Sequence, residues 1–190
     1  MKKIAIFASG AGTNAEKIIQ NPEANYSVAL IACNKPGAGI VTIAENYGIP
    51  VLLVEKKKFM EGNGYVDELK QKNIDLLVLA GFLWKIPDSL IEAYPRRIIN
   101  IHPALLPKYG GKGMYGHHVH EAVINHKEKE SGITIHYVDG HYDNGDTIYQ
   151  VSCPVLESDT PDSLAQRVRL LEHEHYPRVV MEVVKKLNNS

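Results

Sequence analysis

An asparagine and a histidine stand two residues apart in the stretch INIHP, at the end of an apolar run. Because successive side chains of a strand point to opposite faces, we expect Asn100 and His102 to project to the same side. Pro103 biases His102 toward an extended conformation, which keeps both side chains at the tip of the strand. An amide can stabilise a developing oxyanion while an imidazole moves a proton, so this pair suits acyl-type transfer. The alternative is that both side chains only hydrogen-bond the adjacent loop.

A carboxylate would strengthen the catalytic interpretation, and the loop DGHYDNGDTIYQ supplies three, at Asp139, Asp143 and Asp146. A carboxylate beside His102 would orient the imidazole and stabilise its protonated form. Aspartate and asparagine beside glycine are also ordinary turn residues, so Asx-turn formation is the alternative for all three.

The turn GAGTNA, residues 10–15, has the spacing of one form of the dinucleotide-binding fingerprint. A dinucleotide site requires an acidic residue at the end of the second strand to bind the ribose hydroxyls. This sequence has Asn34 and Lys35 there, which argues against NAD. NADP is a weaker alternative, because the cation of Lys35 could bind its 2′-phosphate.

The same turn suits a phosphate monoester, because Gly10 and Gly12 leave the backbone open to an anion. Thr13 and Asn14 add donors at the positive end of a helix. The alternative without a ligand is a self-capped helix, in which Thr13 and Glu16 form a capping box.

Short aliphatic runs alternate with stretches of helical period over the first hundred residues. Near-continuous hydrophobicity predicts strands that are covered on both faces. The alternation predicts right-handed βαβ units in a doubly wound, mostly parallel α/β sheet. We expect strands at 3–8, 27–33, 50–55, 75–81 and 97–102, and helices at about 13–20, 38–47, 59–73 and 87–93.

The rhythm changes after His102, where a glycine-rich loop spans residues 103–116. A long terminal helix is expected from Pro161 to Leu187, after the N-cap signal SDTPDSL. No linker, repeat or low-complexity segment is visible, and 190 residues suit one domain. The other elements expected in this part are a helix at 117–126 and strands at 132–138 and 147–155.

Composition excludes several classes of protein. The chain has 21 basic and 22 acidic side chains, so its formal charge of −1 gives no global attraction to nucleic acid or to an anionic membrane. No apolar stretch approaches the roughly 20 residues that cross a bilayer. Cys33 and Cys153 lie far apart and indicate buried thiols in a reducing compartment. We therefore expect a cytoplasmic protein without nucleic-acid or membrane partners.

Two groups of histidines invite a metal interpretation. Neither group has the spacing H-E-x-x-H or a supporting set of cysteines, so we expect no metal and place these side chains on helix surfaces. The histidines concerned are His117, His118, His120, His173 and His175.

The stretches SGAGTN, LAGFL, NIHPALLPKYGG and HYDNGDTI resemble, in order and spacing, the phosphoribosylglycinamide formyltransferases (glycinamide ribonucleotide transformylases) of the folate-dependent formyltransferase family. The resemblance runs from Lys3 through the terminal helix. It implies one Rossmann-like formyltransferase domain over 1–190, with a phosphate-binding half at about 1–100 and a folate-binding and catalytic half at about 80–190.

The resemblance also implies a reaction. The formyl group of the cosubstrate 10-formyltetrahydrofolate would pass to the amine of N1-(5-phosphoribosyl)glycinamide in de novo purine (IMP) biosynthesis. The products would be formylglycinamide ribonucleotide and tetrahydrofolate, and neither a metal nor NAD(P) would be required. Both substrates are small molecules. The resemblance is compatible with a monomer and with a homodimer.

By the same resemblance each group of site residues receives a role. Catalysis is expected from Asn100, His102 and Asp143. The substrate phosphate is expected at Gly12, Thr13 and Asn14, and further ribonucleotide contacts at Glu172 and Pro103. Folate is expected at Leu83, Trp84, Lys85, Ile86 and Asn100.

The sequence departs from its relatives near the glutamate tail of the folate. Gly62 stands where many relatives carry an arginine, and Lys56, Lys57 and Lys58 lie nearby. The resemblance therefore does not assign the residues that contact the glutamate tail.

Two related enzymes and one non-catalytic module are the alternatives to this function. A methionyl-tRNA formyltransferase needs a further C-terminal RNA-binding domain, and a formyltetrahydrofolate hydrolase normally carries an N-terminal regulatory domain, so we expect neither. The alternative from another class is a non-catalytic nucleotide- or NADP-binding module that uses Gly10, Gly12 and Lys35.

Overall fold

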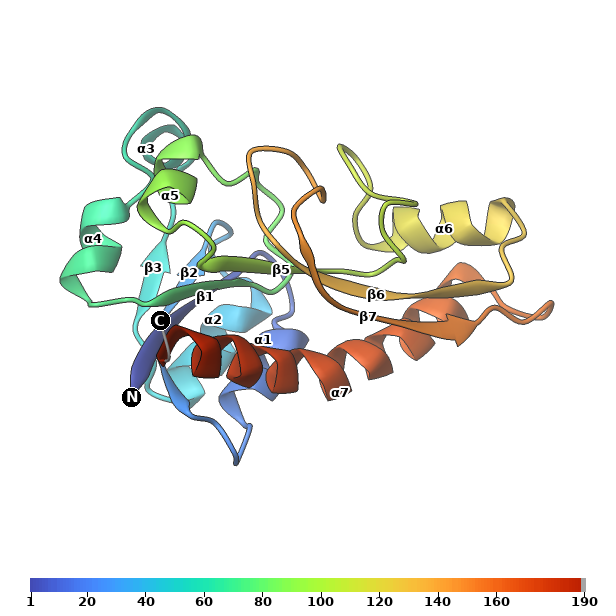
Figure 1. Ribbon diagram of the computed structural model, residues 1–190, viewed down its shortest axis with the longest axis horizontal. Coiled ribbons are helices and arrows are strands. Elements are labelled where there is room, and N and C mark those ends of the chain that lie inside the picture. Colours follow the sequence, from blue (N-terminus) through green and yellow to red (C-terminus); the bar gives the residue numbers. More distant parts are fainter. Residues whose placement is uncertain (189–190) are drawn as a thin grey trace.

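The computed structural model describes residues 1–188, and its strands form a seven-stranded sheet in the order β3-β2-β1-β4-β5-β6-β7 (Figure 1). Neighbouring strands from β3 to β5 pair in parallel, whereas β6 runs antiparallel to β5 and β7 antiparallel to β6. The expected mostly parallel, doubly wound α/β fold is thus confirmed. The strands are β1 (Lys2–Ala8), β2 (Tyr26–Cys33), β3 (Val51–Leu53), β4 (Leu76–Leu79), β5 (Ile98–His102), β6 (Glu130–Tyr137) and β7 (Thr147–Pro154).

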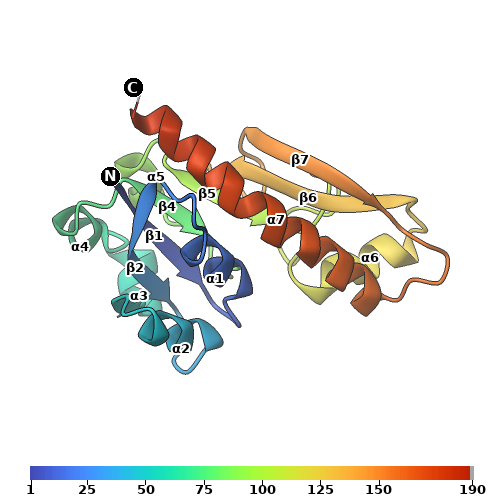
Figure 2. The same cartoon turned by 90° about the horizontal axis from the view of Figure 1, so that it is seen from below.

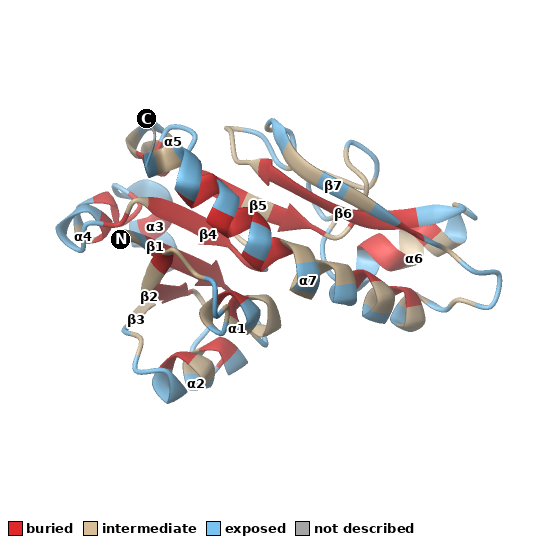
Figure 3. Cartoon of the chain, turned by 60° about the horizontal axis from the view of Figure 1, so that its bottom comes forward, coloured by how far each residue is buried: buried red, intermediate tan, exposed pale blue. Residues whose placement is uncertain are grey.

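Helices cover both faces of the parallel part of the sheet. One face packs against α1, α2 and α7, and the other against α3, α4 and α5. Figure 3 shows the central strands buried between these layers. The helices are α1 (Thr13–Ile19), α2 (Gly39–Asn46), α3 (Lys56–Glu61), α4 (Val66–Gln71), α5 (Asp88–Ala93), α6 (His117–Asn125) and α7 (Pro161–Asn188).

The two cores explain why consecutive residues in the middle of a parallel strand are apolar. On β1, Ile4 and Ile6 belong to the core beneath α1 and α7, and Ala5 and Phe7 belong to the opposite core. All four side chains are at most 1% exposed. A strand that is covered on both faces needs apolar side chains in both directions.

The long C-terminal helix is confirmed, and it runs along the sheet from below α6 to the chain's end (Figure 2). Thr160 and Ser163 form the expected cap: each backbone N–H donates to the other's side-chain oxygen, at 3.0 and 3.2 Å. Further along, the buried hydroxyl of Tyr176 donates to the carbonyl of Leu79 at 2.8 Å. This bond ties α7 to the end of β4. Within the described residues no helix combines the length and the apolarity needed to cross a membrane.

One local expectation and one alternative were wrong. The helix expected at 59–73 is divided into α3 and α4, because Gly64 and Tyr65 take left-handed backbone conformations, with φ of 63° and 66°. A helix cannot continue through that conformation. The capping box of Thr13 and Glu16, which was the alternative to a phosphate site, is absent: α1 begins after Gly12, and no side chain caps it.

Candidate active site

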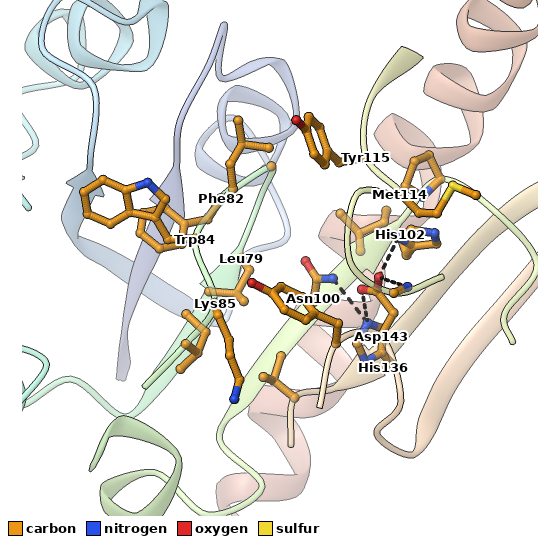
Figure 4. A pocket seen from close by; sticks show the side chains of 18 of the residues that line it. Leu79, Phe82, Trp84, Lys85, Asn100, His102, Met114, Tyr115, His136 and Asp143 are labelled. Carbon is orange, nitrogen blue, oxygen red and sulfur yellow. Dashed lines mark hydrogen bonds and ion pairs between the residues drawn. The ribbon is translucent and has the colours of Figure 1, made fainter. Parts of the chain in front are cut away.

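A cavity of about 310 Å³ opens at the carboxyl ends of β4 and β5 (Figure 4). Ligands of open α/β sheets bind in this position, because the loops that follow the strands diverge there. Its walls come from the segment after β4, from β5 and β6, from the loops at 111–116 and 138–143, and from one residue each of α1 and α7.

Asn100 and His102 both line this cavity from β5, on the same side of the strand as expected. Across the antiparallel pairing, Asn100 lies opposite His136 of β6. His136 Nδ1 lies 2.8 Å from the carbonyl of Tyr137 and must donate its hydrogen there. His136 Nε2 lies 3.2 Å from the amide nitrogen of Asn100 and 3.7 Å from Oδ1 of Asp143. The contact with His136 fixes the orientation of the Asn100 amide.

His102 is 4% exposed, and both of its ring nitrogens face acceptors. Nε2 lies 2.7 Å from the carbonyl of Tyr109 and donates its hydrogen to it. Nδ1 faces Oδ2 of Asp143 at 3.6 Å. Burial lowers the pKa of His102, and the charge of Asp143 and the Tyr109 carbonyl only partly oppose this effect. The resting imidazole is therefore neutral at pH 7, with its proton on Nε2.

Asp143 is held as a carboxylate. Burial would raise its pKa, but interactions with His136, with His102 and with the backbone N–H of Gly111 at 3.0 Å together lower the pKa below its ordinary value. Asp143 itself has a left-handed backbone, with φ of 51°. Figure 4 shows its side chain directed between His102 and His136.

The three aspartates of this loop have separate surroundings. Asp143 alone of the three is paired with His102. Asp139 accepts the backbone N–H of His141 at 2.8 Å, which is the Asx turn of the alternative interpretation. Asp146 forms an exposed ion pair with Arg96 at 2.7 Å.

His136 was missed by the sequence reasoning. It is 1% exposed and contacts Asn100, and its Nε2 lies 3.7 Å from Asp143. The available signal was a lone histidine in the predicted strand 132–138, and its importance depends on an antiparallel register that the sequence does not reveal.

The phosphate segment is only partly in contact with the cavity. Asn14 lines it and donates to Oε2 of Glu172 at 2.9 Å, across a separation of 158 residues. Burial raises the pKa of Glu172, and the bond from Asn14 offsets this in part. Gly12 and Thr13 lie at the start of α1 and are not in the wall of the cavity. Gly12 has φ of 80°, and a Cβ there would lie 2.9 Å from the backbone of Ile40.

A smaller cavity of about 240 Å³ adjoins the first and shares Pro103, Gly116 and Glu172 with it. Arg169, one turn before Glu172 on α7, also lines it. The sequence reasoning did not identify this cation. Its signal was the spacing of three residues from Glu172, which places both side chains on one face of the helix.

The segment expected to bind folate lies in the cavity wall, since Leu83, Trp84, Lys85 and Ile86 all line it. Leu83 is 55% exposed, so its apolar side chain is accessible from the cavity. Figure 4 shows Trp84 and Lys85 across the cavity from His102. Trp84 packs against Phe59 of α3, with ring centroids 6.0 Å apart.

The lysines near the expected glutamate tail differ in their surroundings. Lys58 is paired with Glu68 and contacts the ring of Tyr65. Lys56 and Lys57 are exposed on α3.

The two histidine groups have mostly local partners. His117 and His118 face Glu121 at 3.3 and 3.4 Å. His120 is buried rather than on the surface, and burial is the main cause that lowers its pKa to about 4. His175 packs against the ring of Tyr149 at 5.1 Å. Among residues 1–188 no group of three or more histidine, cysteine or acidic side chains is arranged to hold a metal ion.

Comparisons with known proteins identify the family of the chain. A family model described as formyl transferase matches residues 2–180. A Bacillus subtilis protein, phosphoribosylglycinamide formyltransferase, is 38% identical over 196 residues, which cover 100% of this chain and 97% of that protein. The chloroplastic phosphoribosylglycinamide formyltransferase of Arabidopsis thaliana is 43% identical over 187 residues, or 94% of this chain.

The chain spans only 64% of the length of the Arabidopsis protein. Among solved structures, the phosphoribosylglycinamide formyltransferase from Bacillus halodurans superposes with a TM-score of 0.88 at 39% identity. That match covers 98% of this chain and 97% of the other. The likeness therefore extends over the whole sheet and both walls of the cavity.

Proposed function

The chain belongs to the formyl transferase family, and we propose that it transfers the formyl group of 10-formyltetrahydrofolate to the amine of N1-(5-phosphoribosyl)glycinamide. The products are formylglycinamide ribonucleotide and tetrahydrofolate, a step of de novo purine biosynthesis. The observation that carries this proposal is a buried imidazole, an amide and a carboxylate at one cavity whose opposite wall is apolar.

The proposed reaction begins when the amine attacks the formyl carbon and a C–N bond forms. The carbonyl oxygen becomes an oxyanion, which the amide N–H of Asn100 stabilises. The attacking nitrogen gains a positive charge and loses one proton, which neutral His102 accepts at Nδ1. Imidazolium next to the Asp143 carboxylate is stabilised by opposite charge.

Collapse of the tetrahedral intermediate breaks the bond between the formyl carbon and the folate nitrogen. His102 delivers its proton to that nitrogen, so tetrahydrofolate leaves as a neutral amine. One proton thus passes from the substrate amine to the leaving nitrogen, and His102 returns to its neutral state. The formyl donor is itself activated, so the step requires neither a metal nor a nicotinamide.

The ribonucleotide is assigned to the end of the cavity near Asn14 and Glu172, with Pro103 in the shared wall. Three observations support this assignment. Asn14 Oδ1 is buried without a hydrogen-bond partner, Glu172 is a half-buried carboxylate that can accept from substrate donors, and Arg169 supplies a cation in the adjoining cavity. Gly12 and Thr13 would contribute backbone N–H groups to the phosphate.

The folate is assigned to the wall formed by Leu83, Trp84, Lys85 and Ile86, with Asn100 at its reacting end. An apolar wall with few polar groups is typical of sites for flat organic ligands. The exposed side chain of Leu83 would lose contact with water when a ring covers it.

We further propose that residues 1–190 act as one domain in the cytoplasm. Residues of about 1–100 bind the phosphate end, and residues of about 80–190 bind folate and carry the chemistry. Both substrates are small molecules. A homodimer is neither required nor opposed by this arrangement.

The direct test mixes purified protein with 10-formyltetrahydrofolate and glycinamide ribonucleotide and follows the release of tetrahydrofolate. Turnover that requires both substrates and is lost in a folded His102→Ala variant supports the proposal. No turnover together with calorimetric binding of NADP would instead indicate a non-catalytic nucleotide-binding module.

A further inference from the structure

The backbone of the loop after β5 contacts both members of the His102–Asp143 pair. The carbonyl of Tyr109 accepts from His102 Nε2 at 2.7 Å, and the N–H of Gly111 donates to Asp143 Oδ2 at 3.0 Å. Gly110 between them is tightly packed, because a Cβ there would lie 2.6 Å from Leu106 Cδ2. Three consecutive residues therefore set the positions of both groups.

Tyr109 holds this position with an unfavourable backbone. Its φ is 57°, in the left-handed region, which is unfavourable for a residue other than glycine. Such a conformation persists only when the surrounding structure fixes it. A side-chain contact outside the cavity is available to do so.

That contact is the hydrogen bond from the Tyr109 hydroxyl to Glu128 Oε1, at 2.9 Å. Glu128 lies between α6 and β6, and it also accepts from Lys108 Nζ at 3.0 Å. Burial and the neighbouring Glu128 raise the pKa of Tyr109 to about 12, so the hydroxyl stays protonated as a donor. The ring of Tyr109 also packs against His126, with centroids 5.7 Å apart.

We propose that Tyr109 and Glu128 are positioning residues: their hydrogen bond holds the Tyr109 carbonyl on His102 Nε2 and so keeps Nδ1 of the neutral imidazole free to accept a proton. This inference rests on the proposed function for its kinetic consequences. Its structural consequence, the tautomer of His102, does not depend on any substrate.

The physical reason is a competition for one proton. A neutral imidazole carries a single N–H, and two acceptors face His102, the carbonyl of Tyr109 at 2.7 Å and Asp143 at 3.6 Å. When Tyr109 takes the N–H, Nδ1 carries an unprotonated lone pair beside Asp143 in the cavity wall and can act as a base. When the carbonyl moves away, the proton shifts to Nδ1, bonds Asp143, and leaves the cavity without a base at that atom.

The same contact stabilises the protonated imidazole, because imidazolium needs acceptors on both nitrogens. The groups that face His102 are Asp143 from the loop before β7, His136 from β6 and His120 from α6. Glu128 is faced by Lys108, Tyr109 and His126. Loss of the Tyr109 contact is therefore expected to lower the pKa of His102 further.

Four variants test the inference. Tyr109→Phe keeps the ring and removes the donor, and Glu128→Ala removes the acceptor. Glu128→Gln retains an accepting oxygen without the charge. Lys108→Met is the matched control, because it removes the other partner of Glu128 and leaves the bond to Tyr109 in place.

The first measurement uses ¹H–¹⁵N spectra of the histidine rings, with the His102 signals identified by their loss in His102→Ala. We expect Nε2–H in the native protein, in Glu128→Gln and in Lys108→Met. Tyr109→Phe and Glu128→Ala are expected to show Nδ1–H as well, and a lower titration midpoint for His102. Unchanged His102 signals in both of these variants would overturn the inference, even if formyl transfer is established.

The second measurement is the pH profile of kcat. Loss of one hydrogen bond predicts a decrease of about three- to tenfold in Tyr109→Phe and Glu128→Ala. The limb that His102 controls should move to lower pH, the KM of both substrates should stay within about twofold, and Glu128→Gln should recover most of kcat. An equal loss in Lys108→Met or in Glu128→Gln would mean that charge or loop stability, and not the bond, is responsible. A native protein without turnover would overturn the proposed function and leave the spectroscopic test in force.

Discussion

Two clusters of buried and half-buried side chains line the same cavity, and each joins residues that are distant in sequence. The imidazole cluster consists of Asn100, His102, His136 and Asp143; the other is the Asn14–Glu172 pair. Both contain a carboxylate removed from water. Their ionisation nevertheless differs, since the pKa of Asp143 is lowered and that of Glu172 is raised.

The difference follows from the number of partners. Asp143 receives an N–H from Gly111 and faces two imidazoles, which together outweigh the cost of burial. Glu172 receives one amide hydrogen from Asn14, and burial prevails. A carboxylate with several donors before substrate binds is prepared to stabilise a charge that develops during reaction. A carboxylate that lacks donors is prepared to accept them from a ligand. We therefore expect changes in the imidazole cluster to lower kcat, and changes in the Asn14–Glu172 pair to raise KM.

The largest effect is expected from His102→Ala. Loss of the group that moves the proton should lower kcat by roughly 10²–10⁴-fold, the usual contribution of general acid–base catalysis. The side chain is buried, so circular dichroism must show that the variant is folded. Near-native steady-state turnover in the folded variant would contradict the mechanism.

Asn100→Ala removes the proposed oxyanion donor, for which losses of about 10²–10³-fold in kcat are typical. The KM of both substrates should change little, because the oxyanion exists only in the transition state and intermediate. His136→Asn is an informative companion, since it keeps the Asn100 amide and changes the side chain that contacts both this amide and Asp143, and it should cost less. A larger loss in His136→Asn than in Asn100→Ala would reverse these assignments.

Asp143→Asn keeps the shape of the side chain and removes its charge. The pKa of His102 should fall further, because burial then acts on the imidazole without the opposing carboxylate. We expect kcat to decrease by about 10- to 100-fold, since one pKa unit corresponds to a tenfold change in the protonation equilibrium. In the pH profile of kcat, the limb assigned to His102 should move toward lower pH. An unchanged or upward-shifted limb would separate Asp143 from His102.

The His102→Ala/Asp143→Asn double variant completes this test. Groups that act as one unit lose much less together than the product of their separate losses. A double variant whose loss equals that product would show that the two residues act independently.

The features that depend only on the alternation of side chains along a strand were predictable from the sequence. The shared side of Asn100 and His102 follows from the period of a strand, and the apolar runs indicated a sheet with two covered faces. The divided helix at Gly62–Tyr65 was missed because helical period continues in the sequence across a local left-handed backbone. The family membership expected from the motifs is confirmed.

The membership of the imidazole cluster was harder to predict. Asp143 was not separable from Asp139 and Asp146 by residue type, because its position depends on a left-handed φ and on the N–H of Gly111. His136 depends on the antiparallel pairing of β5 with β6 and on a register shift beside it. The carbonyl of Tyr109 carries no residue-type signal at all. Contacts made by the backbone are determined by the fold and not by the pattern of side chains.

Leu83→Asp tests the apolar wall without touching either cluster. A charged carboxylate in contact with a flat apolar ligand is costly to dehydrate, so the KM for 10-formyltetrahydrofolate should rise by about tenfold or more. The side chain is more than half exposed in the structure, so the fold should tolerate the change. The KM for the ribonucleotide and competition by a folate analogue that cannot donate formyl are the controls. Undiminished competition by that analogue would place the folate elsewhere.

The smallest and most specific effect is expected at Glu172, where Glu172→Gln keeps an accepting oxygen and the size of the side chain. We expect the KM for the ribonucleotide to rise about three- to tenfold, the cost of weakening one charged hydrogen bond, with kcat nearly unchanged. The pH dependence makes the test specific. The raised pKa of Glu172 means that acidification protonates it before ordinary carboxyl groups, so the native KM for the ribonucleotide should increase as the pH falls through that pKa. In Glu172→Gln this dependence should disappear, while the pH profile of kcat, set by His102, should persist. If the variant instead lowers kcat at constant KM, the contrast between the two clusters is wrong, and Glu172 belongs with the reacting groups.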